Sequence, residues 1–354
     1  MLEVLIVGQG IAGSNLAFEL LSRGKKVPII DEGCSGAACL VAAGALNPIT
    51  GKRLVKSWRS DAALPYAKDF YSNLQKKFGA KFYCDRDILQ LCKSAEEAEL
   101  WRSRRADEAY APFLGGWIKP GSLPKLNDKF GGFLIRQAAW VEAPKVMELY
   151  RKHFLGLGIL RLEKFDFSRL KICADFIRYG EINAKRLIFC DGWRAVDNPY
   201  FSWLPYRPAR GEILTLRCGE DFGENIIHRE KWLMKCGESL YRCGSTWDRE
   251  SFRKAGPTDE GKAEIVRALP SIIKDAKFEA VRHESGSRPC TATTRPHLGS
   301  HPKFKNVYSF NGFGSKGYSL SPYFARHFAD WLFGEAELDK EADLSRHVKK
   351  FYKA

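Results

Sequence analysis

Three glycines near the start of the chain have the spacing of a phosphate-binding turn. Gly8, Gly10 and Gly13 follow a short apolar run and precede a stretch with helical periodicity. The first glycine permits a tight turn, the second lets the backbone approach a pyrophosphate, and the third lets the helix pack close to a sheet. The start of such a helix also presents free N–H groups and a positive dipole end to phosphates. The pattern indicates a dinucleotide site, with a glycine-rich turn that binds no ligand as the alternative.

An acidic residue further along supports the dinucleotide interpretation. Asp31 ends a second apolar run, at about the distance from Gly8 where dinucleotide-binding units carry an acid. A carboxylate there accepts hydrogen bonds from both ribose hydroxyls and repels a 2′-phosphate, so FAD or NAD fits better than NADP. The neighbouring Glu32 is a further candidate. The glycine turn and the acid alone leave FAD and NAD open.

A segment of small residues follows the acid. Residues 42–48 read Ala-Ala-Gly-Ala-Leu-Asn-Pro, and small side chains let the main chain reach a flat ring. This segment resembles the Ala-Ala-Gly-x-Leu motif of the D-amino-acid oxidase/glycine oxidase family of flavoenzymes, and the resemblance extends over most of the chain. In that family the backbone of this segment runs along the flavin ring. The resemblance therefore implies FAD, held without a covalent bond, rather than NAD.

Further segments are similar to motifs of the same family, in the same order. Residues 187–193 resemble the second glycine signature of its flavin domain. Usual members have Ala-Ala-Gly or Ala-Thr-Gly where this chain has Cys190, Asp191 and Gly192, and an acid near a pyrophosphate needs a hydrogen-bond donor or solvent. The other matches are residues 208–212 with a Pro-x-Arg-Gly turn, residues 286–289 with Gly-x-Arg-Pro, and residues 296–299 with Pro-x-Ile-Gly.

Residues 311–317 close the series with Asn-Gly-Phe-Gly-Ser-Lys-Gly, ahead of Ser321-Pro322 and a helix. This loop is most similar to that of the flavin domain of the bifunctional enzyme that modifies wobble uridine in tRNA. The cofactor-binding residues that the glycine turn and the resemblance together imply are Gly8, Gly10, Ile11, Ala12, Gly13, Asp31, Glu32, Ala43, Gly44, Ala45, Cys190, Asp191, Gly192, Trp193, Gly312, Gly314, Ser315, Lys316 and Gly317.

The family that this chain resembles oxidises a C–N bond beside a carboxylate, by hydride transfer from carbon to flavin N5. Three residues are implied in that chemistry. Arg288 fits a carboxylate-binding guanidinium, with a surface salt bridge as the alternative. Lys316 is placed to stabilise negative charge at flavin N1 and O2, unless its side chain points to solvent. Trp232 either covers the substrate or is an ordinary core aromatic.

Two further positions carry open alternatives. Tyr241 and Arg242 are adjacent on one expected strand, so at most one of them faces the pocket. Cys290 follows the Arg288 motif, but its position does not match the cysteine that carries covalent FAD in some relatives. No cysteine pair or cysteine–histidine grouping has metal-ligand spacing, so we expect no metal, and the ten cysteines, Cys34 included, are expected to be free buried thiols.

The elements that must position these residues follow from periodicity. Helices are expected over residues 11–23, 64–78, 95–111, 144–154, 259–269 and 322–333. Strands are expected over residues 2–7, 27–30, 159–165, 170–179, 187–190, 212–217, 232–235, 239–243 and 307–310, with loops and short strands over 115–131.

This order of elements predicts an α/β fold of two interleaved domains. The FAD-binding Rossmann-like domain, of the glutathione-reductase type that the resemblance implies, takes residues 1–78, 138–204 and 290–354. An antiparallel-sheet α+β substrate domain takes residues 79–137 and 205–289.

Composition limits the classes of function. No apolar run is long enough for a membrane helix, and the first residues read as a core strand rather than a signal peptide, so we expect a cytoplasmic protein. The net charge of +15 suits anionic partners, but the cations are spread along the chain. Three hypotheses remain: an FAD-dependent oxidase or dehydrogenase of an amino acid or secondary amine, a tRNA-modifying FAD oxidase acting on a glycine-like base substituent, and a non-catalytic flavoprotein.

Overall fold

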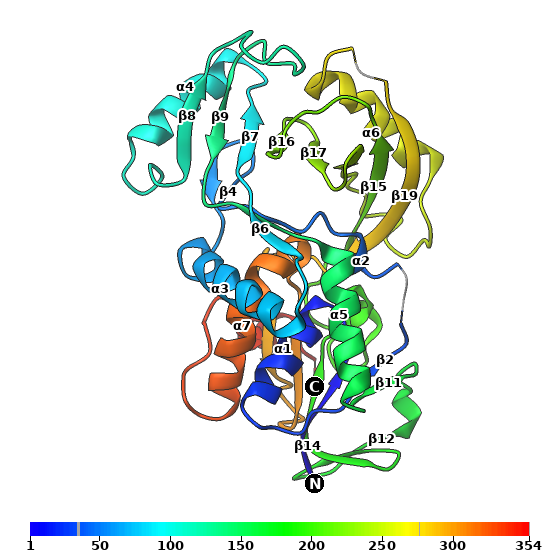
Figure 1. Cartoon of the computed structure of the whole chain (residues 1–354). Helices are drawn as coiled ribbons and strands as arrows, with labels where there is room; N and C mark the ends of the chain where they lie inside the picture. Colours follow the sequence, from blue (N-terminus) through cyan, green and yellow to red (C-terminus); the bar gives the residue numbers. More distant parts are fainter. Residues whose placement is uncertain (34–35, 276, 354) are drawn as a thin grey trace.

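Two eight-stranded sheets hold most of the strands, and they occupy the lower and upper parts of the molecule in Figure 1. The structure is a computed structural model, and it describes residues 1–33, 36–275 and 277–353. The predicted mixed α/β class, with a largely parallel layer and a separate antiparallel sheet, is confirmed.

The first sheet has a parallel centre, in which β1 lies between β2 and β14, with β11 beyond β2 and β21 on β14. Antiparallel pairs extend it through β13, β12 and β20. Its strands are β1 Leu2–Val7, β2 Ile29–Asp31, β11 Leu160–Leu162, β12 Leu170–Ile172, β13 Ile177–Tyr179, β14 Ile182–Phe189, β20 His297–Ser300 and β21 Val307–Asn311. Successive residues of β1 are buried on both faces, which is typical of a parallel sheet covered by helices.

The second sheet is antiparallel except where β16 runs parallel to β7. Its strands, in spatial order, are β19 Glu279–Arg288, β15 Ala209–Arg217, β18 Leu240–Gly244, β17 Trp232–Lys235, β16 Ile226–His228, β7 Ile88–Leu91, β9 Gly132–Ile135 and β8 Leu114–Ile118. Smaller sheets join β3 Ala45–Leu46, β10 Ala139–Val141 and β6 Tyr83–Asp85, and also β4 Ile49–Thr50 and β5 Val55–Lys56.

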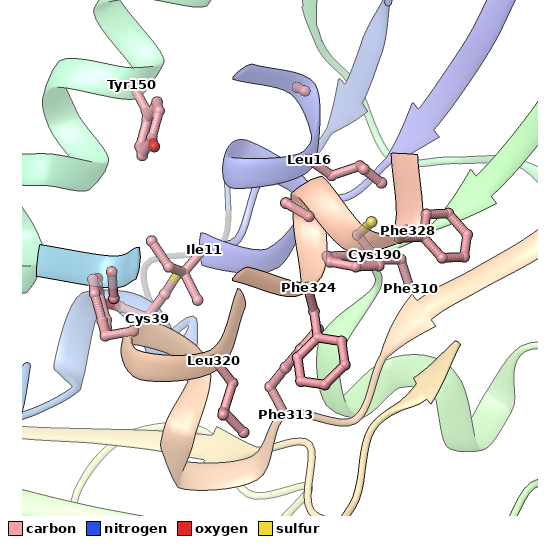
Figure 2. Packing of buried hydrophobic residues seen from close by; sticks show 14 of the residues in the cluster. Ile11, Leu16, Cys39, Tyr150, Cys190, Phe310, Phe313, Leu320, Phe324 and Phe328 are labelled. Atoms are coloured by element: carbon pink, nitrogen blue, oxygen red, sulfur yellow. The ribbon is translucent and has the colours of Figure 1, made fainter. Parts of the chain in front are cut away.

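The helices are α1 Ile11–Ser22, α2 Ala38–Val41, α3 Ser60–Phe78, α4 Ala95–Ala106, α5 Ala143–Gly156, α6 Asp259–Ile272, α7 Gly317–Leu332 and α8 Val348–Phe351. In the lower part of Figure 1, α7 packs against both α1 and α3. Figure 2 shows the core that this packing buries, in which Phe324 and Phe328 of α7 approach Phe310 of β21. This core fixes the start of α1 beside the end of β1, where the glycine turn lies.

Several predicted boundaries were wrong, and proline accounts for three of them. α3 begins at Ser60 rather than residue 64 and contains Pro65, and α7 begins at Gly317 rather than Pro322. α6 continues through Pro270 to Ile272, because the one carbonyl that Pro270 leaves without a donor belongs to Val266, which is exposed. α4 ends at Ala106, before the predicted residue 111.

Strand limits differed as well. β2 starts after Pro28, which has no N–H for a ladder. The strand expected over 170–179 is a hairpin of β12 and β13, β11 is shorter than expected, and β14 begins five residues earlier than expected at Ile182. The strands that were missed are β3, β4, β5, β6, β7, β9, β10, β16, β19 and β20.

The proline inside α7 leaves a backbone acceptor that a tyrosine satisfies. Pro322 cannot donate to the carbonyl of Tyr318, one turn earlier. The hydroxyl of Tyr71, a fully buried residue of α3, donates to that carbonyl oxygen at 3.0 Å. The helix therefore continues through Pro322, and its first turn reaches back to Gly317 beside the glycine turn.

The strands of each eight-stranded sheet all fall within one of the two predicted domains, but β6 pairs across the predicted boundary. The domain limits stay a prediction. No helix among the described residues is both long and apolar enough to cross a membrane. The nine cysteines in the described part of the chain are free, and Cys34 lies outside it.

Candidate cofactor and substrate site

A cavity of about 990 Å³ lies between the two sheets. Its wall includes the turn after β1 and the segment after α2 on one side, and residues of β15, β17 and β19 on the other. The predicted site residues that line it are Gly8, Gly10, Ile11, Ala12, Asp31, Glu32, Ala43, Gly44, Ala45, Cys190, Asp191, Gly192, Trp193, Gly314, Ser315, Gly317, Trp232 and Arg288. The structure therefore brings residues from the predicted motifs to one cavity, except for residues 296–299, none of which lines it.

The glycines of the first turn differ in what requires them. A Cβ on Gly8 would lie 2.4 Å from the Cys190 carbonyl oxygen, and one on Gly13 would lie 1.9 Å from the Gly8 oxygen. A Cβ on Gly10 would meet nothing nearer than Cys39 Sγ at 3.8 Å, and Gly10 has an ordinary extended backbone. Packing within the protein therefore explains why positions 8 and 13 are glycine. At Gly10 the protein itself leaves room for a side chain, so the absence of one is explained only by a ligand in the cavity.

The start of α1 is open to an anion. Gly10 is its N-cap and has no side chain to accept from the first-turn N–H groups, and no acidic residue lies in that turn. Ile11 and Ala12 line the cavity at this point. Unfilled donors at the N-terminus of a helix this long favour a phosphate there by about 0.3–1 kcal/mol from the dipole alone.

Asp31 lies at the end of β2, as predicted, and its oxygens already have protein donors. One oxygen accepts from the backbone N–H of Gln9 at 2.8 Å, and the other accepts from Gly33 N–H at 2.8 Å and from Arg151 at 3.0 Å. A carboxylate has about four acceptor sites, so capacity remains for a ribose hydroxyl. Glu32 forms an ion pair with Arg194 across the same part of the cavity.

The small-residue segment is held rigidly against the cavity. Gly44 has a φ of +77°, and a Cβ there would lie 1.8 Å from the Val141 carbonyl oxygen. Trp140 donates to the carbonyl of Ala43 at 3.0 Å. The position next to Gly44 cannot relax, because its main chain pairs with β10.

Arg242 fixes the residues just before that segment. Its guanidinium donates to the carbonyl oxygens of Ala42 at 2.8 Å and Val41 at 2.7 Å. Its side chain is buried, and burial lowers its pKa despite the attraction of Glu284. Arg242 thus joins β18 of the second sheet to the segment beside the first.

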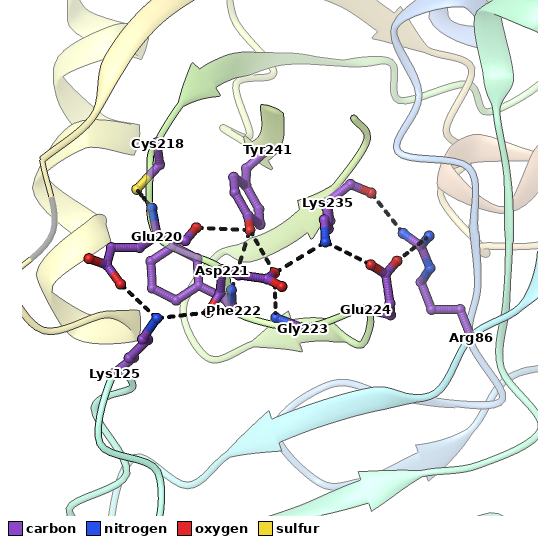
Figure 3. Close-up of polar contacts among 10 residues, drawn as sticks. All are labelled: Arg86, Lys125, Cys218, Glu220, Asp221, Phe222, Gly223, Glu224, Lys235 and Tyr241. Carbon is purple, nitrogen blue, oxygen red and sulfur yellow. Dashed lines mark hydrogen bonds and ion pairs between the residues drawn. The ribbon is translucent and has the colours of Figure 1, made fainter. Parts of the chain in front are cut away.

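Tyr241, the neighbour of Arg242, points the other way, as alternation along a strand requires. Its hydroxyl donates to the Glu220 carbonyl at 3.0 Å within a polar group that also includes Asp221 and Lys235 (Figure 3). Neither Tyr241 nor Arg242 lines the cavity. The expectation that at most one faces the pocket holds, and Arg242 is the one directed toward it.

Asp191 lines the cavity where the resembling motif usually has a small residue. Its two oxygens each accept from a side-chain amide, one from Asn311 at 2.8 Å and the other from Asn198 at 2.8 Å. Enclosure in the wall raises the pKa of Asp191 to about 6, against the lowering effect of these bonds. The sequence implied that this acid needs a donor or solvent, and the structure supplies two asparagine donors, neither of which was predicted for this role.

Arg288, at the end of β19, has its guanidinium in the cavity wall. It donates to Ser245 Oγ at 2.6 Å and to the Thr246 carbonyl at 3.4 Å, and it lies 4.9 Å from the Trp247 ring. It has no carboxylate within 4.0 Å among the described residues, and burial lowers its pKa. A Cβ on Gly211 would lie 2.1 Å from this guanidinium, so the glycine of the Pro-x-Arg-Gly turn makes room for it.

The charged residues beside Gly211 have a structural role. Arg210 and Glu212 are both buried and pair at 3.1 Å. Glu212 also accepts from the backbone and hydroxyl of Thr258, the N-cap of α6, at 3.0 and 2.9 Å. These contacts anchor α6 behind the sheet.

Trp232 of the second sheet and Trp247 of the loop after β18 lie on the substrate side. Trp232 lines the cavity and packs over Gly244 of the neighbouring strand, while its ring also contacts the core around Ile88 and Phe133. Trp247 is 50% exposed and lies between Arg288 and Arg249, 5.7 Å from the latter. Nothing in the local sequence signals Trp247, because the loop that carries it has no periodic pattern.

Three predicted site residues do not line the cavity: Gly13, Gly312 and Lys316. A Cβ on Gly312, which has a φ of +86°, would lie 2.8 Å from Thr291 Cγ2. Lys316 Nζ donates to Ser57 Oγ at 2.6 Å, so its side chain points neither into the cavity nor freely into solvent. Its predicted role at the flavin stays a prediction.

The cavity fits a dinucleotide on the chemistry of its donors. The open start of α1, the acid at the end of β2 and the unexplained glycine at position 10 lie along one wall. Gly317 lets the first turn of α7 approach α1 closely, since a Cβ there would lie 2.9 Å from Ile11 Cγ2. In the described part of the chain, no group of three or more metal-ligating side chains is present.

Comparison with known proteins identifies the family of this architecture. A family model described as FAD dependent oxidoreductase (DAO) matches residues 3–331. The chain is 22% identical over 355 residues to a glycine oxidase of Pseudomonas aeruginosa, covering 94% of this chain and 95% of that protein. It is 21% identical to the tRNA 5-methylaminomethyl-2-thiouridine biosynthesis bifunctional protein MnmC of Azoarcus sp., covering 97% of this chain but 58% of that protein.

The fold is also that of solved structures. The iminodiacetate oxidase of Chelativorans sp. BNC1 matches with a TM-score of 0.80 at 21% identity, over 96% of this chain and 98% of that one. The predicted Rossmann-like fold, the family resemblance and FAD as the cofactor are thereby confirmed.

Proposed function

Because the chain belongs to the DAO family of FAD-dependent oxidoreductases, we propose that it oxidises the C–N bond of an amino acid or secondary amine that bears a carboxylate. The observation that carries this proposal is Arg288. It is a cation in the wall of the cavity that has no carboxylate partner among the described residues.

An unpaired buried cation destabilises a fold unless an anion compensates it. Arg288 is partly buried, and its lowered pKa reflects the desolvation cost of its charge. A substrate carboxylate would supply the anion and could form two parallel hydrogen bonds with the guanidinium. Gly211 leaves the Arg288 guanidinium room to lie flat across β15, so its position is set before substrate binds.

The remaining cavity residues orient the substrate. With its carboxylate on Arg288, the amine end extends into the cavity toward the Ala43–Ala45 wall, while Trp232 covers it and excludes water. FAD, when bound, would accept a hydride from the carbon of the C–N bond, while the amine nitrogen releases a proton to solvent as the C=N bond forms. The product imine is then hydrolysed by water to a carbonyl compound and an amine or ammonia.

Replacement of Arg288 tests this proposal. Arg288→Ala should raise the KM for a carboxylate-bearing amine by about 10- to 150-fold, which corresponds to losing a charge-assisted hydrogen-bonded pair of about 1.5–3 kcal/mol. Arg288→Lys should recover part of the loss, because charge remains without the bidentate fork. Arg217→Ala, which breaks an exposed pair with Glu279 on the same sheet, is the control and should leave KM unchanged. An unchanged KM for Arg288→Ala, with intact FAD binding, would remove Arg288 from the site.

A second candidate substrate is an amine carried on tRNA. The exposed Trp247 between Arg288 and Arg249 forms an aromatic and basic surface beside the site, and the chain has a net charge of +15. Stacking of a base on such a ring contributes about 1–3 kcal/mol. Filter binding of bulk tRNA at low and high salt tests this candidate, because phosphate contacts give strong salt dependence. Undetectable binding at low salt would exclude it.

The non-catalytic alternative is tested by anaerobic mixing of the flavoprotein with a panel of amino acids and secondary amines. An enzyme of the proposed kind bleaches its flavin absorbance with at least one of them. If no amine bleaches the flavin and sulfite forms no adduct with it, the non-catalytic interpretation replaces the proposed function.

A further inference from the structure

Asp191 is a carboxyl group in the wall of the cofactor cavity, and the fold gives it no cation. It is the second residue after β14, and its backbone nitrogen lies 3.3 Å from the point that a Cβ on Gly8 would occupy. It therefore lies beside the turn whose N–H groups and helix dipole favour phosphate. In the described residues it forms no ion pair within 4.0 Å, and Arg194, a cation that attracts it from further away, is paired with Glu32.

The two asparagines that hold Asp191 can only donate to it. The Asn198 side-chain oxygen accepts from the backbone N–H of Tyr200 at 2.9 Å, and the Asn311 oxygen accepts from Gly312 N–H at 2.7 Å. Each amide is therefore oriented with its NH₂ group toward Asp191. The carboxyl group is fixed in place by neutral donors, one on each oxygen, and nothing cancels its charge.

The other titratable groups around Asp191 do not change charge near neutral pH. Burial raises the pKa of Cys190, the residue after β14, and of Tyr206, on the loop before β15, so both stay protonated. Behind Tyr206, burial and the charge of Arg346 lower the pKa of His297, on β20, so it stays neutral. Arg194, in the turn after β14, is paired with Glu32, and β21 contributes the neutral amide of Asn311. Asp191 is the group on this wall whose protonation responds to pH 6–8.

We propose that FAD binding is coupled to proton uptake by Asp191. The pyrophosphate brings negative charge to the turn beside a carboxyl group that has no counter-cation, and like charges in an enclosed site favour the neutral acid. The protonated acid can also donate a hydrogen bond into the cavity, whereas a carboxylate can only accept. The apoprotein therefore binds FAD together with a proton, and acid pH strengthens binding.

The direction and the pH range of the change in FAD affinity follow from the linkage between FAD binding and protonation of Asp191. In the apoprotein the pKa of Asp191 is raised to about 6, so the carboxyl is mostly ionised at pH 7. Bound FAD raises that pKa further, so the Kd for FAD should increase with pH from about 6 upward, by as much as tenfold per pH unit until the pKa of the complex is passed. Below pH 6 the Kd should be independent of pH.

Calorimetric titration of the apoprotein with FAD at pH 7 tests the coupling, because the observed heat includes the ionisation heat of the buffer for each proton taken up. Titrations in two buffers of different ionisation enthalpy should give an uptake approaching one proton per FAD. No uptake, with FAD still bound, would overturn the proposal. The readout involves no substrate, so its failure is distinguishable from failure of the proposed reaction.

Substitutions at Asp191 test whether this residue is the one that takes up the proton when FAD binds. Asp191→Asn should bind FAD without proton uptake and with a Kd that no longer changes from pH 6 to 8. Asp191→Ala repeats the test without an amide that would face the NH₂ groups of Asn198 and Asn311. Asp197→Asn is the matched control: Asp197 also lines the cavity, but its pair with Arg253 lowers its pKa, so uptake should persist. Uptake that survives in a folded Asp191 variant would overturn the proposal.

Discussion

At the residue scale, the glycines of the first turn are required for two different reasons: packing within the protein and contact with a ligand. Gly8 and Gly13 are needed for the fold, since a side chain on either would overlap a backbone oxygen. Gly10 has room for a methyl group and an unstrained backbone. The sequence motif already assigned the second glycine to the pyrophosphate and the third to packing, and the Cβ distances agree with that division.

Gly10→Ala should therefore leave the apoprotein as stable as the parent, or slightly more stable because the unfolded chain loses freedom. Its Kd for FAD should rise at least tenfold, because the added methyl group occupies the space where backbone meets pyrophosphate. Urea unfolding and fluorescence titration with FAD measure the two effects. Gly13→Ala is the comparison and should lower stability itself. Unchanged FAD affinity in Gly10→Ala would contradict this assignment.

Lys316 gives a prediction about pH. Burial, with Arg295 nearby, lowers its pKa to about 8. Below pH 8 the lysine is charged in both the folded and the unfolded chain, so burying its charge lowers the free energy of unfolding by the full amount. This destabilisation decreases as the pH rises from 8 toward the pKa of lysine in the unfolded chain. Lys316→Met should raise the free energy of unfolding by about 2 kcal/mol at pH 7, since Ser57 keeps its bond to the Asn47 carbonyl.

Urea unfolding of the apoprotein at pH 7 and pH 10 checks this. The stabilisation by Lys316→Met should be largest at pH 7 and small at pH 10. A variant that is less stable than the parent at pH 7 would show that the hydrogen bond to Ser57 outweighs the desolvation of the ammonium group.

At the element scale, periodicity predicted the strands and helices of the first sheet better than those of the second. β1, α1 and β21 have apolar patterns that their own residues determine. β19 reads Glu-Ala-Val-Arg-His-Glu-Ser-Gly-Ser-Arg, with no alternation, and it forms because it pairs along its length with β15. Such an edge strand forms only because a partner distant in sequence pairs with it. The position of Arg288 depends on the same pairing, so only the family resemblance indicated it beforehand.

The start of α7 depends on Tyr71, and this contact can be isolated. Tyr71→Phe should cost about 1–2 kcal/mol, because the Tyr318 carbonyl that Pro322 leaves free is then buried without a donor. Pro322→Ala restores an N–H within the helix. In a double-mutant cycle the two changes should couple, with Tyr71→Phe costing less in the Pro322→Ala background. Additive effects in urea unfolding would show that the hydroxyl and the proline act independently.

At the scale of the whole molecule, the cavity requires both sheets to be held in register. Arg242 is one of the ties, because it reaches from β18 to the carbonyls of Val41 and Ala42. The segment it holds leads directly into the wall at Ala43–Ala45. Local sequence patterns could not predict this contact, because Arg242 and Ala42 are 200 positions apart in the chain.

Arg242→Met should free that segment while keeping most of the buried volume. We expect faster hydrogen exchange over residues 41–45 and a Kd for FAD raised by about tenfold or more, in keeping with a lost charged hydrogen-bond pair. Tyr241→Phe, on the same strand but facing away (Figure 3), is the control and should leave FAD affinity unchanged. Exchange rates over 41–45 equal to those of the parent would show that Arg242 is not the tie.

The placement of tryptophans around the cavity has a practical consequence. Trp193 and Trp232 both line it, one from each side. Oxidised flavin absorbs where indole emits, so an isoalloxazine within this wall should quench the emission of both rings by resonance energy transfer. The fluorescence of Trp193 and Trp232 should therefore report on FAD binding without an added label. Arrival of the cofactor, and its displacement, should be visible as a loss and recovery of ultraviolet-excited emission in the unlabelled protein.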